Sequence, residues 1–236
     1  MVGAKGQFPD MMREIAFDTE TTGLKPEEGH RIIELGCVEL VNHVQTGRTF
    51  RALIDPERPI DAKASEISGI TDEMVKGMPR FADVAQTLLD FLGDAPIVAH
   101  NASFDMGFLN AELTRCGLAT LPPERAIDTV VIARRKYPGA PASLDALCKR
   151  YNIDLSERVK HGALLDAKLL ADVYLELCGG RQFAMSLQTD LDAAALIAAR
   201  KPRPAPLAPL LTEDEAAAHA AYIAAFKTEA MWKQYG

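Results

Sequence analysis

The sequence predicts an α/β domain with a mixed sheet, whose first three strands are antiparallel and whose faces are flanked by helices, followed by a flexible C-terminal tail. Apolar segments of strand character come first along the chain, and shorter apolar segments then alternate with segments of helical periodicity. With 236 residues, of which 48% are hydrophobic, the chain can form one sizeable core domain with further segments outside it.

The predicted antiparallel strands cover residues 14–19, 32–41 and 48–54. Strands that follow one another directly favour a meander, in which each strand pairs with the next. Asp55-Pro56 and Arg58-Pro59 end this part of the sheet, because proline cannot donate a hydrogen bond to a strand ladder. Ser68-Gly69-Ile70-Thr71 is predicted to be a turn, with Thr71 as the N-cap of a short helix.

The second half of the domain is predicted to alternate between helices and short strands. Helical periodicity marks residues 81–92, 103–116, 129–136, 143–151 and 162–178. Short buried strands are predicted at 96–99 and 126–128. Gly93 ends the first of these helices, and Gly179-Gly180 ends the domain, because glycine is the residue that most readily terminates a helix.

The chain divides into four predicted regions. An N-terminal extension covers 1–12, the α/β domain 13–180, a linker 181–211 with a proline-dense stretch at 201–211, and a helical tail 212–236. Thr212 is the expected N-cap of the tail helix, because acidic residues follow it in the first turn. The tail is too short for a core of its own, so we expect it to fold against a partner; a disordered tail without function is the alternative.

The charge and cysteine content restrict the class of protein. A net charge of −7 and a pI of about 5.3 are unusual for a protein that grips duplex DNA through a basic surface. A nucleic acid would therefore be held over a short stretch through metal ions, or delivered by a partner. The four cysteines form no C-x-x-C pair and no apolar run could span a bilayer, so we expect reduced thiols, no zinc and a cytoplasmic protein.

Two carboxylates follow the first apolar strand, in the sequence Phe17-Asp18-Thr19-Glu20. Residues two apart in a strand point to the same face, so Asp18 and Glu20 project side by side. Adjacent carboxylates repel unless one is protonated or a cation lies between them, and oxygen ligands suit a hard divalent cation. Two acids on an exposed strand end are the alternative interpretation.

Three further residues could contribute to the same chemistry. Asp105 falls in the first turn of a predicted helix, where the helix dipole alone favours an acid. Asp166 falls inside the 162–178 helix, where an acid is most often only solvated, and His161 stands just before it. Each residue by itself is therefore compatible with a purely structural role.

The motifs FDTETTG, HNASFD and HGALLDA, in this order, resemble those of the DEDD superfamily of 3′–5′ exonucleases, in its histidine-containing (DEDDh) branch. This resemblance covers about residues 13–180. The stretches RKYPGAPASLDALCKRY, KHGALLDAKLLADVYLELCGG and TEDEAAAHAAYIAAFKTEAMW further resemble the epsilon (proofreading) subunit family of bacterial DNA polymerase III. The resemblance then extends over nearly the whole chain.

The resemblance implies a ribonuclease H-like fold and a catalytic site with two divalent ions, Mg²⁺ or Mn²⁺, about 4 Å apart. Asp18 would contact both ions, Glu20 and Asp166 would complete the site of the ion that carries the attacking water, and Asp105 would serve the second ion. His161 would accept the proton from that water, since imidazole titrates near neutral pH. Its glycine-flanked loop would let it move in when substrate binds.

The resemblance also implies substrate contacts and partners. Substrate-facing positions would be Thr19, Ile67, Ser68 and Asn101, together with Asp18, Glu20 and Asp166. Ser68 replaces a histidine that is frequent in the family, which weakens the expected side-chain contact to the DNA 3′ end.

Residues 182–187 resemble a peptide that docks into the bacterial sliding clamp, with Gln182, Met185 and Leu187 as its anchors, although such hexapeptides also arise by chance. The tail would bind the polymerase catalytic subunit, and a small theta-like subunit is a further candidate partner.

These expectations favour a proofreading 3′–5′ exodeoxyribonuclease that releases nucleoside 5′-monophosphates. One alternative keeps the chemistry and changes the substrate, giving an RNA-trimming enzyme similar to ribonuclease T or an oligoribonuclease. Another is a catalytically silent scaffold that only stabilises a polymerase. The scaffold is disfavoured because all five positions of the exonuclease site, the four acids and His161, are occupied by the expected residue types.

Overall fold

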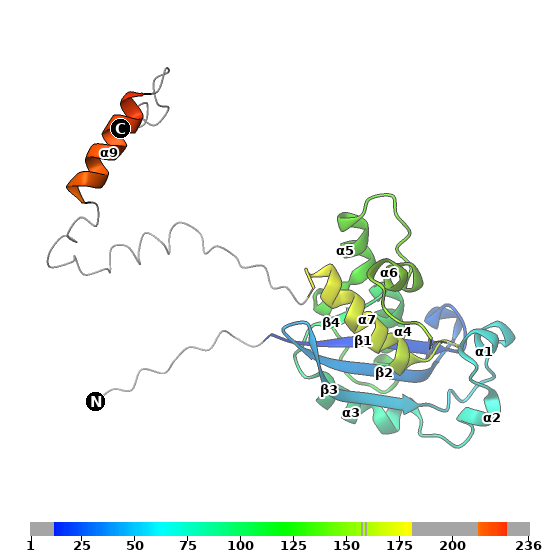
Figure 1. Cartoon of the computed structure of the whole chain (residues 1–236). Coiled ribbons are helices and arrows are strands. Elements are labelled where there is room, and N and C mark those ends of the chain that lie inside the picture. Colours follow the sequence, from blue (N-terminus) through cyan, green and yellow to red (C-terminus); the bar gives the residue numbers. More distant parts are fainter. Residues whose placement is uncertain (1–11, 157, 159, 181–211, 226–236) are drawn as a thin grey trace, which may run out of the picture. The chain divides into compact units, whose positions relative to one another are not determined.

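The computed structural model describes residues 12–156, 158, 160–180 and 212–225 (Figure 1). The chain separates into two compact units, Met1–Met185 and Ser186–Gly236, which are described separately below. Most of the predicted N-terminal extension, the linker with the clamp-like peptide 182–187 and the stretch 201–211, and the last part of the tail, 226–236, lie outside the described residues.

A five-stranded mixed sheet forms the centre of the first unit (Figure 1). Its strands are β1 (Arg13–Thr21), β2 (Ile32–Val41), β3 (Val44–Leu53), β4 (Ile97–Ala99) and β5 (Ala126–Asp128). In space they follow the order β3-β2-β1-β4-β5. The pairs β1–β2 and β2–β3 are antiparallel, whereas β1–β4 and β4–β5 are parallel. The predicted mixed sheet with three antiparallel first strands is therefore confirmed.

The hairpin between β2 and β3 is tighter than the sequence indicated. β3 begins at Val44 rather than at Arg48, because Asn42 and His43 form the turn with positive φ angles of 51° and 66°. No glycine marks this turn, so its sequence does not reveal it. Contacts elsewhere stabilise the turn: the His43 Nδ1 lies 2.7 Å from a carboxylate oxygen of the buried Glu14, and its ring packs edge-on against Tyr174.

The helices of this unit agree closely with the periodicity of the sequence. They are α1 (Ala62–Ser68), α2 (Asp72–Val75), α3 (Phe81–Leu92), α4 (Ala102–Arg115), α5 (Thr129–Lys136), α6 (Leu144–Tyr151) and α7 (Ala163–Leu177), with short 3-10 turns at Pro26–Glu28 and Pro123–Arg125. α1 was not predicted, because its one large apolar residue, Ile67, is exposed and gives no apolar stripe. The predicted turn begins where α1 ends, at Gly69 with a φ of 74°.

The two faces of the sheet are covered by different helices, and β1 contributes to both. Ile15 and Phe17 belong to a core with α3 and α4, whereas Ala16 belongs to a core with α7. This alternation continues along the strand, since successive side chains of a strand point to opposite faces. Even-numbered residues of β1 therefore lie on the α7 side, and odd-numbered residues lie on the α4 side.

Gly36 allows α7 to begin very close to the sheet. A Cβ atom at Gly36, which pairs with Asp18 in the β1–β2 register, would lie 2.2–2.3 Å from backbone atoms of Ala163 and Leu164. The buried Glu34 lies two residues earlier on β2, and its Oε2 accepts a hydrogen bond from the Ala163 N–H at 2.9 Å. The position of the first turn of α7 is thus fixed by β2.

The described part of the second unit is one helix, α9 (Glu213–Ala224). Thr212 is its N-cap, as predicted: the hydroxyl accepts a hydrogen bond from the Glu215 N–H, and the Glu215 carboxylate accepts one from the Thr212 N–H. Its residues from Glu213 to Ala224 include none that is buried. Among the described residues of the whole chain, no helix is long and apolar enough to cross a membrane.

The four cysteines all lie in the described part of the chain, and all are free thiols. Cys37 and Cys148 are buried, Cys116 is half-buried and Cys178 is exposed. Burial raises the pKa of the Cys37 thiol, which keeps it protonated and unreactive. The expectation of reduced thiols holds, although only half of them are buried.

Replacing Gly36 by alanine should destabilise the protein by about 1–3 kcal/mol or more, because the added methyl group overlaps the backbone at the start of α7. Chemical denaturation monitored by circular dichroism measures this change in the free energy of unfolding.

Gly107→Ala in α4 is the matched control, since a Cβ atom there meets no atom within 4 Å. It should leave stability unchanged or raise it by about 0.5–1 kcal/mol, because alanine favours the helix over glycine. Equal stability of the Gly36→Ala variant and the wild type would contradict the close approach.

Candidate active site

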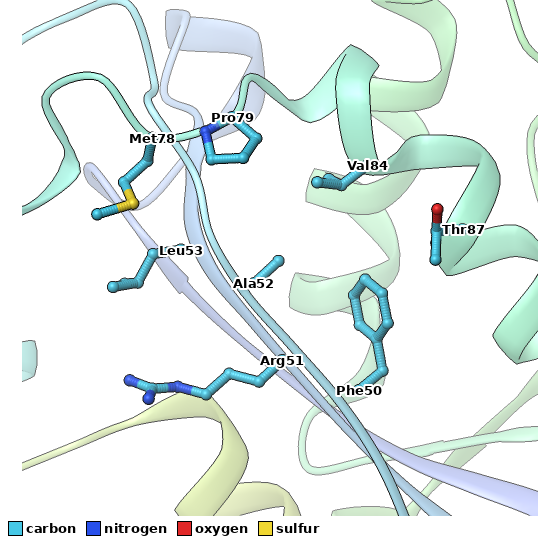
Figure 2. Close-up of a pocket in the computed structure, with 8 residues that line it drawn as sticks. All are labelled: Phe50, Arg51, Ala52, Leu53, Met78, Pro79, Val84 and Thr87. Atoms are coloured by element: carbon cyan, nitrogen blue, oxygen red, sulfur yellow. The ribbon is translucent and has the colours of Figure 1, made fainter.

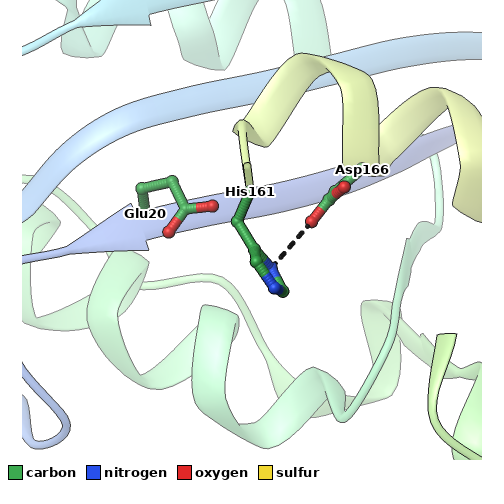
Figure 3. Close-up of side chains that lie close together, drawn as sticks. All are labelled: Glu20, His161 and Asp166. Carbon is green, nitrogen blue, oxygen red and sulfur yellow. Dashed lines mark ion pairs between the residues drawn. The ribbon is translucent and has the colours of Figure 1, made fainter. Parts of the chain in front are cut away.

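The end of β1 places two carboxylates opposite the start of α7. Asp18 and Glu20 are even-numbered residues of β1 and therefore lie on the α7 side, where Asp166 occupies the first turn of α7. His161 stands two residues before that helix begins. Ligand atoms of Glu20, His161 and Asp166 all lie within 4.8 Å of one another (Figure 3).

Asp105 reaches the same region from α4. It lies in the first turn of that helix, is buried, and accepts a hydrogen bond at Oδ1 from the Thr19 hydroxyl at 2.8 Å. Thr19 is the odd-numbered residue between Asp18 and Glu20, so it points to the α4 side and holds Asp105 there. The structure therefore brings the four sequence-predicted carboxylates and His161 to one end of β1.

Burial raises the pKa of three of these carboxylates, and repulsion from neighbouring carboxylates adds to this effect. Burial, followed by the charges of Asp105 and Asp166, raises the pKa of Asp18 well above its ordinary value. Burial, followed by the charge of Asp166, raises the pKa of Glu20 to about 8. Burial also raises the pKa of Asp105. Such a cluster of oxygen donors fits a divalent cation, which would remove the repulsion.

Arg158 supplies a positive charge to this cluster and was not predicted from the sequence. Its Nε and Nη2 each donate to one oxygen of Asp166 at 2.6 Å, and Nη2 also lies 2.9 Å from His161 Nδ1. Nη1 donates to Asp145 in the first turn of α6. These bonds to Asp166 raise the pKa of Arg158. In the sequence, Arg158 is marked only by its position three residues before His161. No general rule of residue spacing would identify it as part of the site.

Asp128 is a second residue that sequence reasoning missed. Its carboxylate accepts hydrogen bonds from the Asn101 and Ala102 N–H groups, both at 3.2 Å, and from the Val130 N–H at 2.8 Å. It therefore joins the start of α4, where Asn101 has a φ of 68°, to the start of α5. Because Asp105 lies in the first turn of α4, Asp128 helps to position it.

Two cavities open on the cluster. One, of about 260 Å³, is lined by Asp18, His100, Ser143, Leu144, Asp145, Arg158, His161 and Asp166. The other, of about 380 Å³, is more apolar, and its lining includes Thr19, Glu20, Leu24, Ile67 and Phe104. Glu20 and Asp18 thus connect a polar, charged compartment with an apolar one.

Of the four further residues predicted to contact substrate, two line a cavity and two do not. Thr19 and Ile67 line the apolar cavity. Ser68 is buried; its hydroxyl donates to the Ala64 carbonyl at 2.9 Å and accepts from the Ile70 N–H at 3.1 Å. Neither Ser68 nor Asn101 belongs to the described lining of these two cavities. In this structure both residues shape the backbone around the site.

A third cavity, of about 430 Å³, lies between β3 and α3 (Figure 2). Its walls are mainly apolar, with Phe50, Met78 and Val84 among them. Among the described residues that line it, only Arg51 is charged, and its side chain extends to the opposite side from Phe50 and Val84 (Figure 2). The Nε of Arg51 donates a hydrogen bond to Glu34 at 2.6 Å. This cavity therefore lacks the charged groups that hydrolytic chemistry requires.

Comparison with known proteins identifies relatives over most of the chain. Residues 15–174 match the Exonuclease (RNase_T) family. DNA polymerase III subunit epsilon of Rickettsia felis is 50% identical over 179 residues, which cover 75% of this chain and 78% of the relative. DNA polymerase III subunit epsilon of Escherichia coli K12 is 42% identical over 223 residues, which cover 89% and 92%.

Solved structures show the same fold. Exonuclease X in complex with 5′ overhanging duplex DNA is 30% identical, with a TM-score of 0.53 over 71% of this chain and 90% of that chain. The nuclease domain of 3′hExo, described as a DEDDh family member bound to rAMP, is 22% identical, with a TM-score of 0.60 over 72% and 93%. The second likeness concerns the fold alone.

The pKa of Glu20 gives a stability profile that can be measured. A glutamate that titrates near pH 4.5 when unfolded and near pH 8 when folded gives the folded state more bound protons between these values, so stability falls as pH rises through this window. The melting temperature in EDTA should therefore fall between about pH 5 and about pH 8.5, and Glu20→Gln should flatten that fall.

Thermal denaturation in EDTA at a series of pH values tests this, with Asp94→Asn, an exposed change of equal charge, as the control. The control should retain the wild-type slope. A profile for Glu20→Gln that runs parallel to the wild type would show that Glu20 is not crowded by the other carboxylates.

Proposed function

The chain belongs to the exonuclease family of the DNA polymerase III epsilon subunits, and we propose that Asp18, Glu20, Asp105 and Asp166 hold two divalent ions, Mg²⁺ or Mn²⁺, for its reaction. The protein is a 3′–5′ exonuclease that proofreads for DNA polymerase III, and divalent metal is typical of its family. The convergence of four carboxylates and one histidine on the end of β1 is the observation that supports the metal assignment.

The proposed roles follow from where each side chain lies. Divalent ions, when bound, neutralise the charge of the phosphodiester and activate the attacking water. After burial, the charges of Asp105 and Asp166 contribute most to the raised pKa of Asp18, so Asp18 lies near both helices' acids and is the candidate to contact both ions. Glu20 and Asp166 lie together on the α7 side, and Asp105 is fixed by Thr19 on the α4 side. Glu20 and Asp166 would help to hold the ion that activates the water, and Asp105 would help to hold the ion that stabilises the leaving 3′ oxygen.

His161 is the proposed general base. About half of its side chain is exposed, and its ring lies within reach of both Glu20 and Asp166. An imidazole at the mouth of the site can accept the proton of the attacking water and pass it to solvent. The product would be a nucleoside 5′-monophosphate.

The apolar cavity beside Glu20 is the proposed site of the terminal nucleoside at the DNA 3′ end. Ile67 and Phe104 offer apolar surface for a base, and Thr19 adjoins the carboxylates. We therefore propose Thr19 and Ile67 as substrate contacts. For Ser68 and Asn101, where the sequence also predicts contacts, we propose that they position the backbone around this cavity.

The proposed assembly uses the part of the chain beyond the exonuclease domain 13–180. The exposed helix α9 supports a role of the tail 212–236 in binding the polymerase catalytic subunit. Gln182, Met185 and Leu187 of the linker are proposed to bind the sliding clamp, and a theta-like subunit is a further proposed partner. Chromosomal replication places such an assembly in the bacterial cytoplasm, which is the location that we propose.

Asp18→Asn should reduce exonuclease activity by on the order of 10²–10³-fold or more, because it removes a charge that stabilises the transition state through both ions. Release of nucleoside 5′-monophosphate from single-stranded DNA with Mg²⁺ measures this. The control Asp94→Asn should retain wild-type activity, and the Asp18→Asn variant should still bind the polymerase catalytic subunit.

The same assay separates the DNA enzyme from the RNA-trimming alternative. Faster release from single-stranded RNA than from DNA of the same sequence would overturn the DNA assignment. An Asp18→Asn variant that degrades DNA at the wild-type rate would show instead that the metal assignment is wrong.

Truncation after Gly180 should separate the two proposed activities of the chain. The shortened protein should retain exonuclease activity on single-stranded DNA, because every residue of the proposed site lies before that position. It should no longer co-elute with the polymerase catalytic subunit on gel filtration. Full-length Asp18→Asn is the control that should co-elute without activity, and retained co-elution of the truncated protein would exclude the tail as the polymerase-binding segment.

A further inference from the structure

Arg158 occupies the position in the carboxylate cluster where a cation is expected. Its guanidinium binds both oxygens of Asp166 at 2.6 Å in a bidentate arrangement, which is the strongest geometry for this pair. Both side chains are almost fully buried, at 9% and 4% exposed. An ion pair with so little water around it is stronger than one at a surface, so Asp166 is firmly committed to Arg158.

The same guanidinium also engages His161. The Nδ1 atom of His161 lies 2.9 Å from Nη2 of Arg158 and 3.2 Å from Oδ2 of Asp166. Because arginine has only donor groups and stays protonated, we infer that Nδ1 accepts a hydrogen bond from Nη2. The lone pair on Nδ1 is then occupied, and the ring proton resides on Nε2. In this arrangement neither ring nitrogen has a free lone pair with which to accept a proton from water.

We propose that Arg158 is an internal counter-cation that competes with the divalent ion for Asp166, so that binding of the ion releases both Asp166 and His161 from the guanidinium. The inference rests on the proposed role of Asp166 as a metal ligand. Arg158 acts through these two residues and is therefore a positioning residue, not a catalytic one.

Charge gives the first argument for competition. The guanidinium carries a full positive charge among the groups that would hold a divalent cation. Its field partly offsets the burial and the repulsion that raise the pKa of Asp18 and Glu20. Two cations held at one carboxylate in a site of low polarity repel each other by an amount that exceeds thermal energy. Binding of the ion therefore favours displacement of Arg158 from Asp166.

Asp145 gives the second argument, because it provides Arg158 with another partner. Nη1 donates to Asp145, which is half-exposed and is not a proposed metal ligand. After leaving Asp166, the guanidinium can keep this partner and extend toward water, so that no buried charge is left unpaired. Asp145 therefore offers Arg158 a partner that does not depend on Asp166.

Binding of one divalent ion would therefore release both Asp166 and His161 for their proposed roles. Without a divalent ion, Asp166 and His161 are both held by Arg158 in an arrangement that cannot carry out hydrolysis. With the ion bound, Asp166 becomes a ligand and His161 Nδ1 becomes free to accept a proton. The competence of the base is thus coupled to occupancy of the metal site.

Titration of the full-length, chelator-treated protein with Mn²⁺ in a calorimeter tests the proposal without relying on activity. Arg158→Met keeps much of the length of the side chain and removes the charge, so it should bind Mn²⁺ at least about tenfold more tightly than the wild type, a difference of about 1.4 kcal/mol. In EDTA the melting temperature of Arg158→Met should be lower than that of the wild type. On addition of Mn²⁺, the melting temperature of the variant should rise by more than that of the wild type.

Arg48→Met is the matched control, because Arg48 is also an arginine paired with a buried glutamate, Glu39, but lies on β3 away from the cluster. It should bind Mn²⁺ as the wild type does. Arg158→Lys keeps the positive charge but cannot form the bidentate contact with Asp166. Its affinity for Mn²⁺ should therefore fall between those of the wild type and Arg158→Met. This variant tests the proposal if Arg158→Met does not fold.

The outcomes separate this inference from the proposed function. Unchanged or weaker Mn²⁺ binding by Arg158→Met would overturn it, because the guanidinium would then support the ligand instead of competing with the ion. Failure of the wild type itself to bind Mn²⁺ would overturn the metal assignment, and the competition with it. Tighter binding by Arg158→Met with an unchanged control would support the competition.

Discussion

Repulsion between carboxylates at the end of β1 is the constraint on which the rest of the site depends. Asp18, Glu20, Asp105 and Asp166 come from one strand and two helices, and the fold holds them closer than their charges allow without a counter-ion. The repulsion among these carboxylates destabilises the folded state. The packing of the sheet between α7 on one side and α3 and α4 on the other offsets this destabilisation. A divalent cation converts this cost into binding energy.

The geometry of the site is set by residues that do not belong to it. Glu34 holds the first N–H of α7, Gly36 lets that helix approach the sheet, and Asp128 joins the starts of α4 and α5. The two acids of the cluster that lie on helices, Asp105 and Asp166, both occupy first turns, so small movements of these helix starts would displace them directly. The precise placement of the acids at the proposed metal site therefore depends on contacts between elements as well as on the acids themselves.

Much of the fold follows from local pattern, and the parts that do not follow depend on contacts distant in sequence. β2 and α3 have the bounds that periodicity predicts, and the alternation of side chains along β1 predicts that Asp18 and Glu20 lie on one face. The β2–β3 turn escapes such reasoning because Glu14 and Tyr174 stabilise His43 from far along the chain. Similarly, no local pattern shows that Arg158 reaches Asp166, since their pairing depends on how the segment before α7 folds back.

The alternation of β1 has a further consequence for how the chain reaches an active form. A shift of one residue in the pairing of β1 would exchange its two faces, sending Asp18 and Glu20 toward α4 and Thr19 toward α7. Such a misfolded chain would bury charges in an apolar core and would also lack the four-acid cluster. A copy of the chain with this error would therefore lack the carboxylate cluster and, with it, the metal binding that we propose.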